Sequence, residues 1–201
     1  MSGMKPTVEI EGCRAAHAEL DRRLAGLTEK TIRRISALPD WTVAHTLAHI
    51  ARNADSVVRR LRGVIDDQVM DQYVGGQAGR VAEIESSAGQ PVAELLADVR
   101  ASSAAVEEII GIVPDDAWDR LSRSVSGDLT PAHRVVYSRW REVEVHHVDL
   151  GLGYTPADWP VALVERWLPE LVQGLAGRAD HAALLAWMIG RGPTPDLGPW
   201  G

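Results

Sequence analysis

The chain has 201 residues, a formal net charge of −7 and 45% hydrophobic residues. These values are typical of a globular protein with one full core, and the negative charge argues against binding to nucleic acid or to a membrane through basic surfaces. No stretch approaches the roughly 20 apolar residues of a membrane span, and the first ten residues do not resemble a signal peptide. We therefore expect a cytoplasmic monomer or homodimer with no nucleic-acid or membrane partner.

Four long amphipathic segments are predicted in chain order. Helical periodicity covers residues 7–36, 42–63, 91–111 and 130–150. Asp40 or Thr42 is a suitable N-cap for the second segment, and Thr130 followed by Pro131 predicts the N-cap and first helical position of the fourth. Residues 73–80 are expected to form an ordered turn that leads into a short helix from Arg80, and residues 122–128 to form a loop.

An antiparallel four-helix bundle is the natural way to bury four such apolar stripes. We predict an all-α fold of this type, with the bundle at residues 1–153. Residues 154–201 carry two shorter helical patterns, at 161–175 and 182–189, followed by an irregular tail. This segment is too small for a core of its own, so we expect a short C-terminal α-helical and irregular extension that packs on the bundle.

The segment from Arg141 to Asp149 concentrates the residues that can carry chemistry. Glu142 and His146 are four residues apart, so on a helix they lie on the same face. His45 and His49 have the same spacing on the second segment. One of these histidines together with Glu142 and His146 would give the ligand set of a catalytic zinc site, a set that also suits non-haem iron(II).

Simpler roles remain open for these residues. A histidine on an apolar helix face is more often a hydrogen-bonded core residue than a metal ligand, Glu142 can form a surface ion pair, and Asp149 can be an acceptor at the end of a helix. His147 is expected on a different face from His146, because consecutive helical residues are about 100° apart.

An enzyme with this sequence would need a nucleophile from outside the chain. There is no nucleophile elbow, phosphate-binding loop or dinucleotide fingerprint. Cys13, the only cysteine, is expected to be a small packed residue, and His17, His133 and His181 to be structural or surface residues. Water or a thiol cosubstrate is then the expected nucleophile.

Two segments resemble the signatures of a known family. Trp41 to Asp55 and Arg141 to Gly151 are similar to the two signature segments of the mycothiol-dependent maleylpyruvate isomerases, which are DinB-like metal-binding four-helix bundles. Residues 73–85 resemble the connection between the second and third helices of that family, and residues 185–200 resemble its C-terminal tail. The resemblance therefore extends over nearly the whole chain.

The resemblance implies a role for each matching residue. His49, Glu142 and His146 would bind zinc or another divalent metal, and Asp149 would orient His146 or a bound thiol. Arg191 and Arg80 would face the active site and bind the cosubstrate or a substrate carboxylate.

The implied cosubstrate is mycothiol, a low-molecular-weight thiol, and the implied substrate is a small molecule. The thiolate would add to the cis double bond of maleylpyruvate, the resulting single bond would rotate, and elimination of the thiol would give the trans isomer. Transfer of the thiol to an electrophile (an S-transferase) is the alternative enzyme. A non-enzymatic metal-stabilised helical sensor or interaction module is the alternative of another class.

Overall fold

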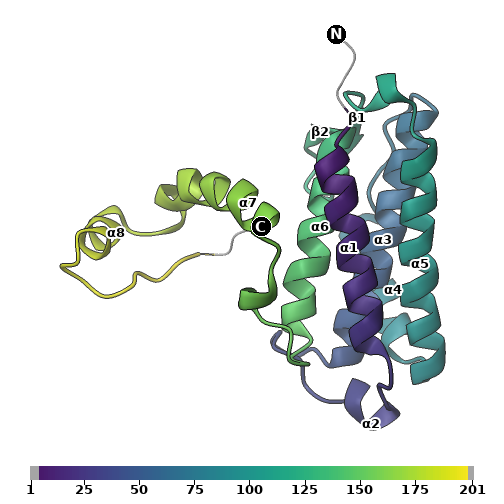
Figure 1. Cartoon of the computed structure of the whole chain (residues 1–201), viewed down its shortest axis with the longest axis horizontal. Coiled ribbons are helices and arrows are strands. Elements are labelled where there is room, and N and C mark those ends of the chain that lie inside the picture. Colours follow the sequence, from purple (N-terminus) through teal and green to yellow (C-terminus); the bar gives the residue numbers. More distant parts are fainter. Residues whose placement is uncertain (1–4, 199–201) are drawn as a thin grey trace. The chain divides into compact units, whose positions relative to one another are not determined.

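A computed structural model describes residues 5–198 of the chain, and Figure 1 shows its elements. Pro199 and Trp200, two of the residues that resemble the C-terminal tail of the family, lie outside the described residues. The chain divides into two compact units, one ending at Asp158 and one beginning at Trp159. Across the described residues, no helix is long and apolar enough to span a membrane.

The first unit is built on four long helices that lie side by side (Figure 1). They are α1 (Thr7–Leu24), α3 (Val43–Ile65), α5 (Val92–Ile112) and α6 (Ala132–Asp149). α3 packs against both α5 and α6, and α1 packs against α6 and α5. The predicted all-α bundle is confirmed.

Contacts at one end of the bundle establish the direction of each helix. Lys5, just before α1, lies 3.8 Å from Asp115, just after α5. Arg120 donates a hydrogen bond of 3.0 Å to the carbonyl of Val64, near the end of α3. α1 and α6 thus start at the end of the bundle where α3 and α5 finish. The shorter α4 (Gly76–Ala88) packs along α3 and connects it to α5.

Two boundaries differ from the sequence expectations. The helix expected over residues 7–36 ends at Leu24, because the chain turns through Gly26 with a φ of 82°, and a short α2 (Glu29–Ile32) follows. α4 begins at Gly76, four residues before the expected start at Arg80, after Gly75 adopts a left-handed conformation. Thr42 is the N-cap of α3 as predicted, and its side chain accepts from the backbone of His45.

The segment before α6 forms a small hairpin, which sequence reasoning did not predict. After a 3-10 turn η1 (Asp115–Ala117), β1 (Leu121–Arg123) pairs antiparallel with β2 (Leu129–Pro131). The prediction that Thr130 caps α6 is wrong, because Thr130 belongs to β2 and Pro131 occupies the N-cap position without a side-chain cap. Ser122 and Thr130 form a cross-strand pair, and both hydroxyls contact the guanidinium of Arg60 on α3.

The second unit consists of α7 (Val161–Gly174), a 3-10 turn η3 (Leu175–Arg178) and α8 (His181–Met188). A 3-10 turn η2 (Pro156–Asp158) precedes it in the first unit. Arg178 ties this unit together internally, because its guanidinium donates to the carbonyl of Gly198 and its own carbonyl accepts from the Gly198 amide. Packing of this extension on the bundle stays a prediction.

Candidate metal centre

Three potential metal-ligating atoms converge where the second turn of α3 faces the second half of α6. The Nε2 atoms of His49 and His146 are 3.0 Å apart, and each lies 3.3 Å from Oε2 of Glu142. The helical spacing predicted from the sequence places Glu142 one turn before His146 on α6, and His49 comes from α3 about ninety residues earlier. In the described part of the chain these three residues form the group that could hold a metal ion.

The rings of both histidines are held by neighbouring side chains. Nδ1 of His146 is 2.8 Å from Oδ2 of Asp149, so the carboxylate accepts the Nδ1 hydrogen and leaves Nε2 directed at the cluster. Trp41 packs edge-on against the ring of His49, with 5.6 Å between centroids. Asp149 thus lies where its predicted role in orienting His146 requires it to be.

The electrostatics of the cluster reflect three mutually attracted groups. Burial alone would lower the pKa of His146, but hydrogen bonds and charges from Asp149 and Glu142 outweigh it and raise that pKa to about 9. Burial opposes ionisation of Glu142, yet the two histidines hold its pKa well below the usual range. Burial lowers the pKa of His49. Without a metal, a proton on His146 therefore holds the cluster together, and a cation could replace it.

The cluster is shielded but accessible. Only 5% of the His49 side chain is exposed, whereas 24% of the Glu142 side chain is. Three protein ligands with one accessible side are the arrangement of a catalytic metal site, in which a water molecule, thiol or substrate takes the open position.

The two arginines assigned by resemblance lie in different units. Nη2 of Arg80, on α4, is 3.3 Å from Nδ1 of His49, so Arg80 adjoins the cluster. Arg191 follows α8 in the second unit, is exposed, and donates to the carbonyl of Gly190.

The other histidines and the cysteine have structural contacts. His45 completes the capping box of α3 and lies 3.4 Å from Glu85, so His49 is the member of the pair that joins the cluster. His147 stacks on Tyr154, with 3.9 Å between ring centroids. Cys13 is fully buried, and burial raises the pKa of its thiol to about 12, so a thiolate does not form there near neutral pH.

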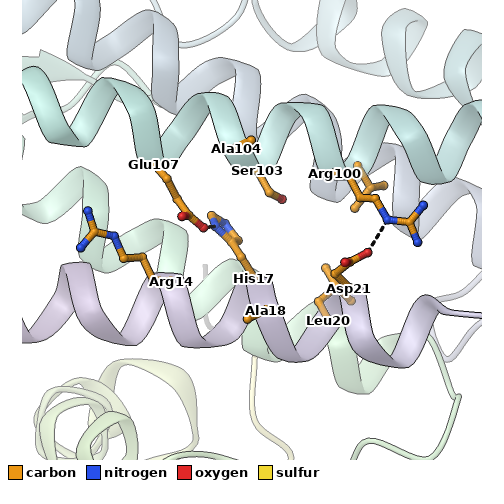
Figure 2. Close-up of a pocket in the computed structure, with 10 residues that line it drawn as sticks. Arg14, His17, Ala18, Leu20, Asp21, Arg100, Ser103, Ala104 and Glu107 are labelled. Atoms are coloured by element: carbon orange, nitrogen blue, oxygen red, sulfur yellow. Dashed lines mark hydrogen bonds and ion pairs between the residues drawn. The ribbon is translucent and has the colours of Figure 1, made fainter.

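His17 lines a groove of about 480 Å³ between α1 and α5, which Figure 2 shows. Its Nδ1 lies 3.2 Å from Oε1 of Glu107, and nearby Arg100 pairs with Asp21. On its other side, Nε2 of His17 accepts a hydrogen bond of 3.1 Å from Nε of Arg139, a residue of α6. His17 is therefore a neutral core residue that connects this groove to a buried arginine.

Sequence reasoning assigned no role to Arg139. The residue is fully buried and precedes Glu142 by three positions, so both belong to the same face of α6. That spacing, together with a position among the apolar residues of the helix, was the available signal.

Comparison with known proteins identifies the family. A family model described as the mycothiol maleylpyruvate isomerase N-terminal domain matches residues 13–151. The chain belongs to this family. The match covers the four long helices almost completely and includes all three residues of the cluster, and the family is that of an enzyme, as the resemblance implied.

Two solved structures have the same fold. The crystal structure of the mycothiol-dependent maleylpyruvate isomerase shares 24% sequence identity, with a TM-score of 0.79, over 85% of this chain and 72% of that one. A histidine-to-alanine variant of the mycothiol-dependent maleylpyruvate isomerase shares 23% identity with a TM-score of 0.78 over the same shares of the two chains. No curated protein matches the chain.

Proposed function

We propose that the protein is a metal-dependent enzyme that uses a low-molecular-weight thiol, mycothiol, to isomerise a cis double bond in a substrate of the maleylpyruvate type. The observation that carries the proposal is the convergence of His49, Glu142 and His146 in a chain of this family. The metal we propose is zinc, and each of these residues would supply one ligand atom.

The spacing of the three ligand atoms supports this assignment. Ligands about 2.0–2.1 Å from a tetrahedral zinc ion lie roughly 3.3–3.4 Å from one another. The observed separations are 3.0, 3.3 and 3.3 Å. Two imidazoles and one carboxylate also suit iron(II), so metal analysis of the purified protein distinguishes the two ions.

The chemistry that bound zinc supplies is stabilisation of the cosubstrate sulfur as a thiolate near neutral pH. Asp149 keeps the Nδ1 hydrogen of His146 in place, so Nε2 retains its lone pair for the ion. In the reaction, the thiolate sulfur forms a bond to one carbon of the cis double bond, the remaining single bond rotates, and the same carbon–sulfur bond then breaks. The thiol is recovered and no oxidant or reductant is consumed.

Arg80 is proposed to bind negative charge on the substrate. When Nε2 of His49 is a ligand, its Nδ1 carries the ring hydrogen and cannot accept from Arg80. The guanidinium, 3.3 Å away, would then be available to a carboxylate or to the enolate charge that develops after addition. Arg191 is proposed, from the family resemblance alone, to contribute in the same way.

The decisive experiment supplies both partners to the zinc-loaded protein. Mycothiol and maleylpyruvate are added, and the loss of the cis isomer is followed by absorbance and by chromatography. We expect turnover that requires both zinc and mycothiol, and its absence would refute the isomerase. Conjugates between mycothiol and a model electrophile would instead identify an S-transferase.

A matched pair of variants tests the ligand role. Glu142→Gln should lose stoichiometric zinc and activity while the bundle stays folded, because the neutral amide is a much weaker ligand. Glu108→Gln, on an exposed face of α5, should change neither quantity. A protein that keeps its zinc after Glu142→Gln would contradict the proposed site, and one that binds zinc without any thiol chemistry would be a metal-stabilised module.

A further inference from the structure

A second cavity adjoins the metal centre on the side of the hairpin. It has a volume of about 280 Å³, lies between α3 and α6 beside β1 and β2, and includes Glu142 in its lining. Its lining is rich in cations and also contains amide and hydroxyl groups. The arginines are Arg60, Arg134, Arg139 and Arg141.

Arg139 is the most unusual of these cations. Its side chain is fully buried, and its contacts are neutral: Nη1 donates to the carbonyl of Ile50 at 2.8 Å and to the side-chain oxygen of Asn53 at 2.9 Å, and Nε donates to His17. Within residues 5–198, no carboxylate forms an ion pair with it, and its Nη2 has no hydrogen-bond partner. A buried charge without a counterion is costly, so such a group points to an anion that is supplied from outside.

Arg60, which lines the cavity from α3, is likewise buried without an acidic partner among the described residues. It is 6% exposed, and it donates to the hydroxyls of Ser122 at 2.9 Å and of Thr130 at 3.3 Å. None of its contacts in the described structure is a carboxylate. Burial lowers its pKa to about 10, so the side chain stays charged at neutral pH.

Arg52, a half-buried arginine elsewhere in the bundle, has acidic partners. It contacts Asp98 with both carboxylate oxygens within 2.9 Å. The chain also has more acidic than basic residues, so carboxylates are not scarce. Arg60 and Arg139 are the buried arginines of the described residues, and both line this one cavity without an acidic partner.

We propose that this cavity binds a terminal carboxylate of the substrate between Arg60 and Arg139. The reactive double bond of the same molecule then lies at the metal centre, so the enzyme selects organic acids that can occupy both places. The inference rests on the proposed function, because that function places the reactive double bond of the substrate at the metal centre. Glu142 lines the cavity and also belongs to the metal centre, so the cavity adjoins that centre, and its volume suits a small acid group.

Maleate, a small cis dicarboxylate, is the probe for this site. Its binding to the full chain is measured by calorimetry and by thermal shift, with the protein zinc-loaded and metal-free. We expect maleate to bind in both states, because the arginines do not depend on the metal. Failure to bind the metal-free protein would overturn the assignment, and so would tighter binding of inorganic phosphate than of maleate.

Three variants separate binding from folding. Arg60→Gln should weaken maleate binding at least tenfold, and Arg60→Lys should restore part of it because the charge returns without the planar fork. Ser138→Leu places a larger apolar side chain in the cavity from α6 and should block maleate without removing a charge. The matched control Arg100→Gln, in the groove of Figure 2, should bind maleate like the unmodified protein.

The outcomes also distinguish this inference from the proposed function. If Arg60→Gln does not fold, Ser138→Leu provides the test, with circular dichroism as the check on folding. Maleate binding that depends on Arg60 or Ser138 in a protein without isomerase activity would support the cavity and refute the isomerase. Isomerase activity together with maleate binding that is unchanged in the folded variants would do the reverse.

Discussion

Asp149→Asn is the sharpest test of how the metal centre is organised. The carboxylate accepts a hydrogen bond of 2.8 Å from Nδ1 of His146, and only 20% of the Asp149 side chain is exposed. The asparagine has nearly the same shape but no charge, and its amide can turn either way. The substitution therefore weakens the group that fixes the His146 ring and makes its Nε2 basic.

The expected loss can be bounded. A charge-assisted hydrogen bond contributes about 1.5–3 kcal/mol, and loss of a partner behind a metal-binding histidine typically lowers metal affinity about 10–100-fold, or about 1.4–2.7 kcal/mol. One effect opposes this loss. Asp149 also helps to raise the pKa of metal-free His146 to about 9, so it increases competition from protons. We therefore expect a smaller loss of affinity at pH 7 than at pH 8.5.

Competition with a chromophoric chelator measures zinc affinity at both pH values. Asp158→Asn is the matched control, because Asp158 accepts hydrogen bonds from Thr155 outside the metal centre and should leave zinc affinity unchanged. An Asp149→Asn affinity within twofold of the unmodified protein at pH 8.5 would refute the reasoning, as would an equal loss in Asp158→Asn.

Three further predictions concern the stability of the bundle, each measured as the free energy of unfolding in urea. Gly12→Ala should destabilise by about 1–3 kcal/mol, because a Cβ there overlaps the ring of Trp140, whereas Gly111→Ala, where nothing lies within 4 Å, should stabilise by about 0.5–1 kcal/mol; the same sign for both would be contrary evidence. Tyr154→Phe removes a donor from the buried carboxylate of Glu144 and should destabilise by about 1–3 kcal/mol, so an unchanged free energy would count against that contact. Burial and the charge of neighbouring Arg139 lower the pKa of His17 from 6.5 to about 2. As the pH falls below 6.5, the unfolded chain therefore takes up a proton at His17 before the folded chain does, and the free energy of unfolding should decrease by about 2 kcal/mol between pH 7 and pH 5. A His17→Gln variant whose free energy of unfolding decreases as steeply would rule this out.

The long-range arrangement was predictable where helical periodicity was strong. The apolar stripes predicted four helices, and the spacing of Glu142 and His146 predicted that these two side chains share one face. The choice between His45 and His49 came from the family resemblance, because the two histidines are one helical turn apart on the same segment and spacing alone does not distinguish them. The structure explains the difference: His45 lies in the first turn of α3 and serves its capping box, whereas His49 lies one turn further along, opposite α6.

The elements that were missed depend on tertiary contacts. β1 and β2 have three residues each, and exposed Leu121 and Leu129 give no alternating pattern, so nothing local distinguishes the hairpin from a loop. Thr130 followed by Pro131 has the local chemistry of a helix N-cap, but its hydroxyl serves Arg60 instead. The burial of Arg139 depends on α1 and α3 together, so its spacing to Glu142 and its apolar neighbours in α6 indicate the shared face but not the contacts that bury it.

The distance along the sequence between His49 and Glu142 has a consequence for biosynthesis. At roughly 5–20 residues per second, α6 leaves the ribosome about 5–20 s after α3. Until then the nascent chain presents one of the three residues, and a single imidazole holds a divalent ion only weakly. With the metal proposed here, acquisition would thus be deferred until the last helix of the bundle has docked, and the growing chain would not yet offer a complete site to a competing ion.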